Sequence, residues 1–182
     1  MMSDPESWLA DVRRLDPEAL GAAYDGLSPA LFRYAYRLLG DTQVAEDVVA
    51  ESFSRLLTAI RNGGGPRTFL RAYLYRVAHN LAMDYHRATP VQALDEDELH
   101  PVAVESPQDE VGDVAAARQA LWHLTAEQRQ VIVLKFYQGL SNEEVAAAID
   151  KPVGAVKSLQ HRALEALRRM LTREAGEMER VA

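Results

Sequence analysis

The sequence predicts an all-α protein in which two small helical domains are joined by a flexible acidic linker. Apolar residues recur at helical spacing within the first 88 residues and again from about residue 114, and no strand-like alternation persists. Residues 88–113 instead hold three prolines, eight acids and little periodic apolar content, which is typical of a linker. The predicted domains are therefore residues 1–88 and 114–182, with residues 89–113 as the linker.

The N-terminal domain divides into helices at clear stop signals. Residues 17–40 suit a helix that ends at Gly40, and the glycines and proline of NGGGP at 62–66 break the chain again. The helix between these stops carries an apolar face made of Val44, Val48, Val49, Phe53, Leu56, Leu57 and Ile60. In the next helix the expected apolar face is Leu70, Leu74, Val77, Leu81 and Tyr85, and we expect Tyr85 to lie in the core.

The C-terminal domain contains a predicted helix-turn-helix. TAEQ at 125–128 and SNEE at 141–144 both match the capping-box spacing, and Pro152 suits the first turn of the last helix. The first helix of the motif has Val145, Ala146 and Ile149 on its apolar side. The second has Val153, Val156, Ala163, Leu164, Leu167 and Leu171 on one side and Lys157, Ser158, His161, Arg162, Glu165, Arg168 and Arg169 on the other. This pattern favours a recognition helix in the major groove of DNA, although a helical hairpin with a solvated basic face is the alternative.

The charge of −7 is unevenly distributed along the chain. Residues 61–90 hold five arginines and one acid, and residues 151–182 hold seven bases and four acids. Residues 91–120 between them hold eight acids and one arginine. Two basic segments separated by an acidic spacer favour a polyanionic partner more than the whole-chain charge suggests.

Composition excludes several classes of protein. The chain has no cysteine, so it forms neither a disulfide framework nor a thiolate metal site. No apolar run approaches the roughly 20 residues of a membrane span, and the first residues lack the apolar core of a signal peptide. We therefore expect a cytoplasmic protein without membrane insertion.

The segment RTFLRAYLYRVAHNLAMDYHR at 67–87 mixes aromatic and basic side chains. Aromatic rings stack on unpaired bases and arginines follow the phosphate backbone, so this composition suits single-stranded nucleic acid. The alternative is that the tyrosines fill a core and the arginines are merely solvated.

A ridge of charge is predicted on the polar side of the helix that contains AEDVVAES. Asp47, Glu51 and Arg55 follow one another at four-residue spacing and could dock a basic protein surface, although this pattern taken alone favours a solvated helix face. No catalytic constellation is found: His79 and His86 have no acids that complete a metal set, and DEDE at 95–98 lies in the linker. The sequence therefore predicts neither an enzyme nor a cofactor or metal site.

Three segments in this order resemble a bacterial sigma factor of the sigma-70 class, in its small extracytoplasmic-function (ECF) group. LFRYAYRLLGDTQVAEDVVAESFSRLL resembles the start of the family's second conserved region, and FLRAYLYRVAHNLAMDYHR resembles the part that melts and reads the −10 element. LWHLTAEQRQVIVLKFYQGLSNEEVAAAIDKPVGAVKSLQHRALEALR resembles the region that reads the −35 element. The resemblance implies two helical domains and a promoter-specificity subunit of RNA polymerase that is not itself an enzyme.

The resemblance also implies roles for particular residues. Docking to core RNA polymerase falls to Glu46, Asp47, Glu51 and Phe53. Capture of melted −10 DNA falls to Arg71, Tyr75, Arg76, His79, Asn80, Met83, Asp84 and Arg87. Reading of the duplex −35 element falls to Val153, Ala155, Lys157, Ser158, His161 and Arg162. A threonine is usual where Ala155 stands and an arginine followed by an apolar residue where Leu159 and Gln160 stand, so this chain departs from the family pattern at these three positions.

Two further expectations follow. Small members of the group are usually restrained by an anti-sigma factor, so such a partner is expected. A free-standing helix-turn-helix regulator is the alternative function; it explains the C-terminal half but neither the arginine–tyrosine segment nor the acidic linker.

Overall fold

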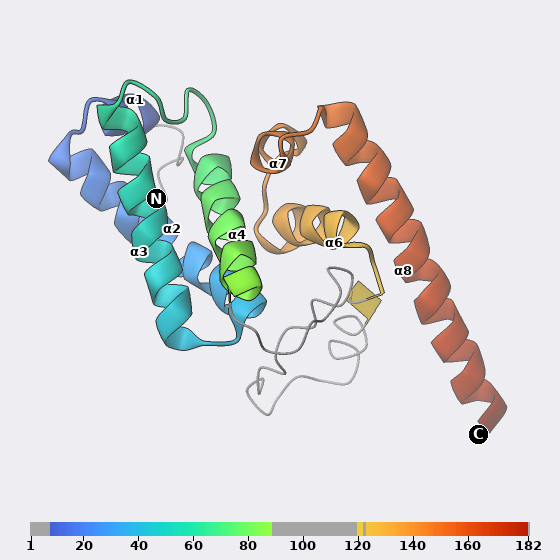
Figure 1. Ribbon diagram of the computed structural model, residues 1–182. Helices are drawn as coiled ribbons and strands as arrows, with labels where there is room; N and C mark the ends of the chain where they lie inside the picture. Colours follow the sequence, from blue (N-terminus) through green and yellow to red (C-terminus); the bar gives the residue numbers. More distant parts are fainter. Residues whose placement is uncertain (1–7, 89–119, 122, 182) are drawn as a thin grey trace. The chain divides into compact units, whose positions relative to one another are not determined.

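The computed structural model describes residues 8–88, 120–121 and 123–181 (Figure 1). Within these ranges every regular element is a helix, which confirms the predicted all-α class. The predicted linker at 89–113 lies outside the described residues. The chain divides into two compact units, and each is described by itself.

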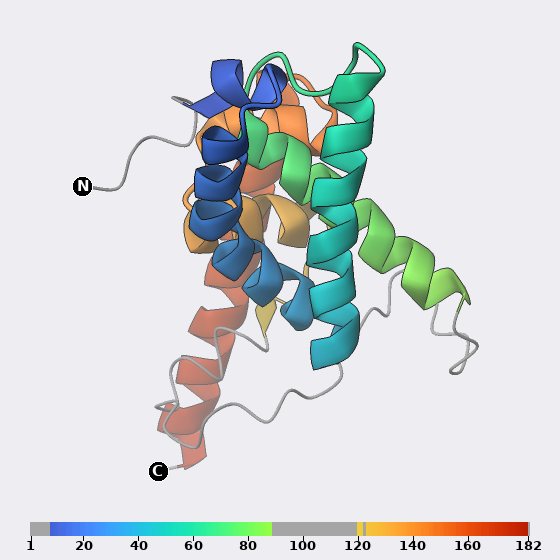
Figure 2. The same cartoon turned by 90° about the vertical axis from the view of Figure 1, so that its left-hand side faces the viewer.

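The N-terminal unit is a bundle of three helices, α2 (Pro17–Leu39), α3 (Thr42–Arg61) and α4 (Leu70–Ala88), and each contacts the other two. A short helix, α1 (Leu9–Arg13), packs on α2. Figure 2 shows α2 and α3 running side by side while α4 crosses them obliquely.

Capping residues fix where these helices begin and end. The Asp16 carboxylate accepts a hydrogen bond of 2.9 Å from the Ala19 N–H, and Asp41 accepts one of the same length from Val44. Gly40 ends α2 in the left-handed conformation at φ 70°, which confirms the predicted stop. Because only two residues separate α2 from α3, the helices return antiparallel and bury their apolar faces together.

The core of this unit lies where the three helices meet. Its fully buried large side chains include Leu31 of α2, Leu56 of α3, and Leu70 and Leu74 of α4. Tyr85 was expected in this core, and that expectation is wrong, because its side chain is 39% exposed. The reason is visible in Figure 2, where the last turns of α4 extend beyond α3.

The helices that follow in the C-terminal part of the chain are α6 (Ala126–Ile132), the π-helix η2 (Val133–Tyr137), α7 (Asn142–Ile149) and α8 (Val153–Val181). Both predicted capping boxes are present. Thr125 and Gln128 bond reciprocally, and the Glu144 N–H donates to Ser141 Oγ at 3.0 Å while Glu144 Oε2 accepts from the Ser141 N–H at 2.7 Å.

Helix α6 packs on α8 through Leu124, Ile132 and Ala163, which are buried together. The Arg129 guanidinium donates to the carbonyls of Leu121 and Leu124 at 3.1 and 3.0 Å, and burial lowers its pKa. The buried face of α8 consists of Val156, Leu159 and Ala163. Leu164 was predicted on that face and is instead 46% exposed, because it directly follows the buried Ala163 and is turned about 100° away from it around the helix.

The turn between α7 and α8 is tight. Asp150 has φ 55°, and the Lys151 N–H donates to the Ala146 carbonyl at 3.0 Å, which closes the end of α7. Lys151 Nζ lies 2.8 Å from Glu127 Oε1 at the start of α6. The turn is thus tied to a neighbouring helix, and the start of α8 is fixed.

Among the helices that the structure describes, we find none with the length and apolar character needed to cross a membrane.

Candidate nucleic-acid interface

Helix α4 carries the predicted −10 residues on two kinds of surface. Asn80, Asp84 and Arg87 are exposed, and Asp84 forms an ion pair with Arg87. Arg71, Arg76, His79 and Met83 are half-buried beside them. The Arg76 guanidinium carbon lies 5.6 Å from the centroid of the Tyr73 ring, a cation–π contact that places an arginine against an aromatic face.

Tyr75 differs from the other members of this set. It is only 5% exposed, and its ring meets the Tyr34 ring edge to face at a centroid distance of 5.1 Å. The ring belongs to the core between α2 and α4, so it offers no stacking surface to DNA. The expectation that Tyr75 contacts −10 DNA is therefore wrong, because the ring is buried.

The imidazole of His79 contacts α2. Its Nδ1 lies 2.9 Å from the Tyr34 hydroxyl, and burial lowers the pKa of His79 to about 4. The imidazole is therefore neutral at neutral pH. Positive charge beside Asn80 comes from arginines and not from this histidine.

The acidic ridge on α3 is exposed as predicted from its spacing. Glu46, Asp47 and Glu51 are exposed, and Glu51 Oε1 accepts from Arg55 Nε at 2.8 Å. Phe53 is half-buried and packs on Tyr24 of α2 with ring centroids 4.9 Å apart. Tyr24 is 46% exposed and adds an aromatic surface that sequence reasoning missed, because no motif marks it.

On α8 the predicted −35 residues share an accessible side. Lys157, Ser158, His161 and Arg162 are exposed, while Val153 and Ala155 are half-buried near the helix start. Ser158 Oγ donates to the Gly154 carbonyl at 3.0 Å, and Arg162 Nε donates to the Ser158 carbonyl at 3.3 Å. The serine oxygen therefore presents lone pairs outward, and the terminal nitrogens of Arg162 keep their donors for another partner.

Gln160, unlike Lys157, Ser158, His161 and Arg162, contacts another helix of the motif. Its Nε2 donates to Asn142 Oδ1 of α7 at 2.9 Å, and the bond is partly buried. This amide pair braces the two helices of the motif against each other. It explains why a polar residue is accommodated at this position.

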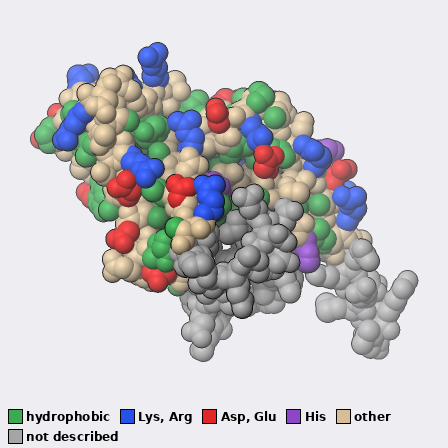
Figure 3. Space-filling model, viewed as in Figure 1, with side chains coloured by type: hydrophobic (Ala, Val, Ile, Leu, Met, Phe, Trp, Pro, Cys, Tyr) green, Lys and Arg blue, Asp and Glu red, His purple; other side chains and the backbone are tan. Residues whose placement is uncertain are grey.

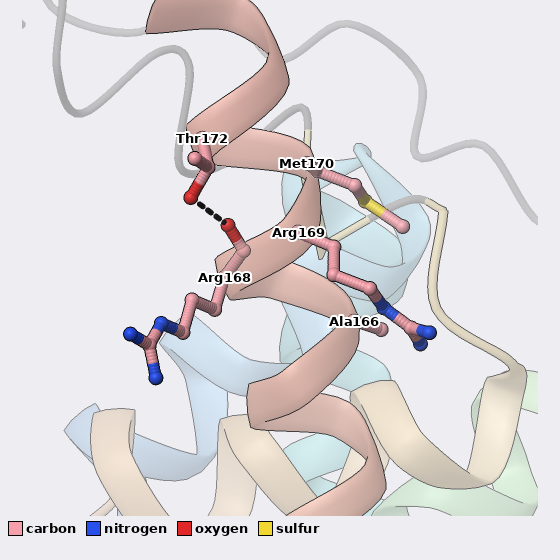
Figure 4. Close-up of a pocket in the computed structure, with 5 residues that line it drawn as sticks. All are labelled: Ala166, Arg168, Arg169, Met170 and Thr172. Atoms are coloured by element: carbon pink, nitrogen blue, oxygen red, sulfur yellow. Dashed lines mark hydrogen bonds between the residues drawn. The ribbon is translucent and has the colours of Figure 1, made fainter.

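Further along α8 the structure has a pocket lined by Ala166, Arg168, Arg169, Met170 and Thr172 (Figure 4). Thr172 Oγ1 donates to the Arg168 carbonyl at 2.7 Å. Figure 4 shows Arg168 and Arg169 extending to opposite sides of the helix, so they do not converge on one ligand.

Charge on the visible face of the molecule is mixed. Figure 3 shows Lys and Arg side chains interspersed with Asp and Glu rather than gathered in one continuous patch. Within the described ranges no three His, Asp or Glu side chains are grouped so that they could hold a metal ion.

Comparison with known proteins assigns both units to one family. The family model for sigma-70 region 2 matches residues 23–89, and the model for sigma-70 region 4 matches residues 120–169. The chain is 35% identical over 151 residues to the ECF RNA polymerase sigma factor SigL of Mycobacterium tuberculosis, covering 81% of this chain and 85% of SigL. It is 33% identical over 170 residues to the ECF sigma factor BldN of Streptomyces coelicolor, covering 88% of this chain but only 63% of BldN.

Solved structures show the same fold. CnrH, solved in complex with the cytosolic domain of CnrY, matches with a TM-score of 0.63 at 24% identity, over 93% of this chain and 98% of that chain. RpoE of Bartonella quintana, solved with the anti-sigma factor NepR, matches with a TM-score of 0.62 at 24% identity, over 82% and 94% of the two chains. Because regions 2 and 4 both match and SigL is aligned over most of its length, this chain belongs to the sigma-70 family, as an ECF RNA polymerase sigma factor.

Proposed function

We propose that this chain directs RNA polymerase to specific promoters in the cytoplasm by binding the core enzyme, reading duplex −35 DNA and capturing melted −10 DNA. The observation that carries the proposal is that sigma-70 regions 2 and 4 occur in one chain and that the recognition helix of region 4 exposes a polar, basic side. A free-standing regulator needs no region 2.

Helix α8 suits major-groove reading. Lys157 and Arg162 supply cations to phosphates or to guanine edges, and the outward lone pairs of Ser158 accept from the amino groups of cytosine or adenine. The amide pair between Gln160 and Asn142 keeps the helix-turn-helix rigid while these contacts form. Val153 and Ala155 approach the groove at the helix start.

Helix α4 suits the melted −10 strand. The Asn80 amide can hydrogen-bond the edge of an unpaired base, and Met83 offers an apolar contact beside it. Arg71, Arg76 and Arg87 supply positive charge for nearby phosphates. Asp84 partly neutralises Arg87 through their ion pair, so Arg76 contributes more positive charge next to Asn80.

The ridge on α3 is proposed to dock core polymerase. Asp47 and Glu51 present carboxylates to a basic surface, and Phe53 with Tyr24 presents aromatic area next to them. A charged rim around an aromatic anchor is a common composition for a protein interface. As the resemblance implies, an anti-sigma factor is the expected competitor for these surfaces.

The first test is transcription from a library of randomised promoters with purified bacterial core polymerase, with and without the chain. We expect start sites that appear only with the chain and that share paired −35 and −10 elements. Lys157→Ala with Arg162→Ala should relax the preference at −35 and leave the −10 preference intact. Arg168→Ala with Arg169→Ala removes the same charge from the same helix and serves as the control. If no chain-dependent start site appears and the chain alone binds a duplex operator as a dimer, the protein is instead a free-standing regulator.

A further inference from the structure

The second half of α2 is a basic surface that the residues assigned above do not include. Residues 26–39, GLSPALFRYAYRLL, contain Arg33 and Arg37 and no acid. Both arginines are exposed. Because they are four residues apart on a helix, their side chains start about 5–6 Å from each other on the same side.

Tyr34 lies between Arg33 and Arg37 in the sequence and joins this part of α2 to α4. Tyr34 is buried, its hydroxyl lies 2.9 Å from His79 Nδ1, and its ring packs on Tyr75. The second half of α2 therefore lies against the middle of α4, and the two helices are in contact (Figure 1). Asn80 is the next residue after His79 and is exposed, so Arg33, Arg37 and Asn80 each lie within three residues of the Tyr34–His79 contact that joins the two helices.

The charges around this border are positive on balance. His79 is neutral, because burial lowers its pKa to about 4. Asp84 is the sole acid on α4 and is already paired with Arg87. Arg76, held over the Tyr73 ring, adds a third guanidinium from the α4 side. Arg33, Arg37 and Arg76 thus each lie within three residues of Tyr34 or His79, where the two helices meet.

We propose that Arg33 and Arg37 of α2, together with Arg76 of α4, bind the phosphates of the unpaired promoter strand next to the nucleotide held at Asn80. The inference rests on the proposed capture of −10 DNA and extends it to a second helix. Guanidinium groups suit this role, because each can donate two hydrogen bonds to one phosphate. The expected ligand is a single strand, because only an unpaired base can reach the Asn80 amide and Met83 while the arginines bind the phosphates of the same strand.

The size of the effect follows from counterion release. Each phosphate contact to a single strand contributes about 0.7 to the slope of log affinity against log salt, so losing two should reduce the slope by about 1.4. The same relation makes the affinity about tenfold weaker near 0.15 M salt.

The test uses holoenzyme and a promoter recovered from the library, prepared once as a duplex and once with a non-complementary, pre-opened −10 bubble. Binding to both templates is measured by fluorescence anisotropy from 0.05 to about 0.3 M salt, a range in which such slopes are resolved. Arg33→Gln with Arg37→Gln should reduce the slope on the bubble template by about 1.4, and the Lys pair at the same positions should restore most of it. The control, Arg14→Gln with Arg61→Gln, removes one exposed arginine that follows α1 and one at the end of α3, and it should change nothing.

The outcomes separate this proposal from the proposed function. If the wild-type chain gives no promoter-dependent binding, the proposed function fails and takes this inference with it. If wild type binds but the Gln pair keeps the full slope on the bubble, α2 does not touch the strand. The proposal is also overturned if the Gln pair lowers the salt slope equally on a third DNA fragment that holds only the duplex −35 element. An equal decrease of the slope in the Arg14→Gln, Arg61→Gln control overturns it as well. Affinity for core polymerase, measured by native gel shift, should be the same for all variants.

Discussion

The hydroxyl of Tyr34 lies 2.9 Å from Nδ1 of His79, and this contact joins α2 to α4 across 45 residues of sequence. Tyr34 is buried and also packs on Tyr75, so three aromatic side chains form one layer between the helices. The layer fixes which side of α4 faces outward, and Asn80 follows directly on the exposed side. A core contact thus orients the proposed base-capturing residue.

The stability of the N-terminal unit should depend on His79 between pH 6.5 and 4. Burial lowers the folded-state pKa to about 4, so in this window the unfolded chain binds a proton that the folded chain does not. Stability is therefore fully present above pH 6.5 and falls as the pH drops toward 4, by up to about 3 kcal/mol at 1.36 kcal/mol per unit. Urea unfolding monitored by circular dichroism at pH 7, 6, 5 and 4.5 measures the loss.

The control for this effect is His79→Gln, which does not titrate and keeps an amide near the Tyr34 hydroxyl. The difference in unfolding free energy between wild type and this variant should shrink as the pH falls, because only wild type loses stability through this group. A difference that is constant with pH would mean that His79 protonates equally in both states.

Gly26 should tolerate alanine less well than Gly21, although both lie in α2. A Cβ at Gly26 would meet Trp8 Cη2 at 2.7 Å, whereas nothing lies within 4 Å of one at Gly21. Gly21→Ala should stabilise by about 1 kcal/mol through helix propensity. In Gly26→Ala the displaced Trp8 ring should offset most of that gain and change the tryptophan emission, measured in a Trp122→Phe background. Equal stabilisation with unchanged emission would show that Trp8 does not cover Gly26.

Much of the fold could be predicted because its signals are local. Gly40 and the capping boxes at Thr125 and Ser141 each specify a helix end through two or three neighbouring residues. Burial was less predictable, because it depends on which distant helix covers a side chain. Tyr85 lies on the apolar stripe of α4 but in its last turns, which extend past α3 (Figure 2), and its exposure cannot be read from periodicity.

The residues of the candidate site likewise fall into those that local sequence signals predict and those that depend on contacts between distant segments. Exposed residues such as Lys157 and Asn80 follow from helical spacing and resemblance. Tyr24 and the amide pair between Asn142 and Gln160 do not, because each joins two segments that no motif connects. Tyr75 lies in an arginine-rich stretch that suits single-stranded DNA, yet a tyrosine in such a stretch can equally fill a core, as it does here.

The amide pair between Asn142 and Gln160 should show measurable coupling. Gln160→Ala and Asn142→Ala should each cost about 1 kcal/mol, and the double variant should cost little more than either, because one hydrogen bond is lost in all three. Thermal unfolding of the four proteins gives the coupling energy, which should lie between about 0.5 and 1 kcal/mol. Strictly additive costs would show that the side chains do not meet in solution.

The acidic ridge should contribute to core binding through its charge. Asp47→Lys should weaken the affinity for core polymerase about tenfold, because it replaces attraction with repulsion at a partly desolvated interface. Glu18→Lys makes the same charge change at another exposed position and should have little effect. Surface plasmon resonance on immobilised core compares them, and equal losses would indicate a general charge effect and not a specific ridge.

Asp150 should limit both the stability of the helix-turn-helix and its affinity for DNA. It adopts φ 55°, a conformation that glycine reaches without the strain imposed by a Cβ, and its exposed carboxylate lies at the turn before α8. Asp150→Gly should stabilise by about 0.5 kcal/mol, whereas Asp150→Ala should destabilise by a similar amount, because alanine keeps the strain and lacks the local hydrogen bonding of aspartate. Both variants remove the same negative charge, so both should raise holoenzyme affinity for duplex −35 DNA equally and more strongly at low salt. Thermal unfolding and anisotropy separate the two effects. If only the glycine variant binds more tightly, backbone strain rather than charge controls the affinity for DNA.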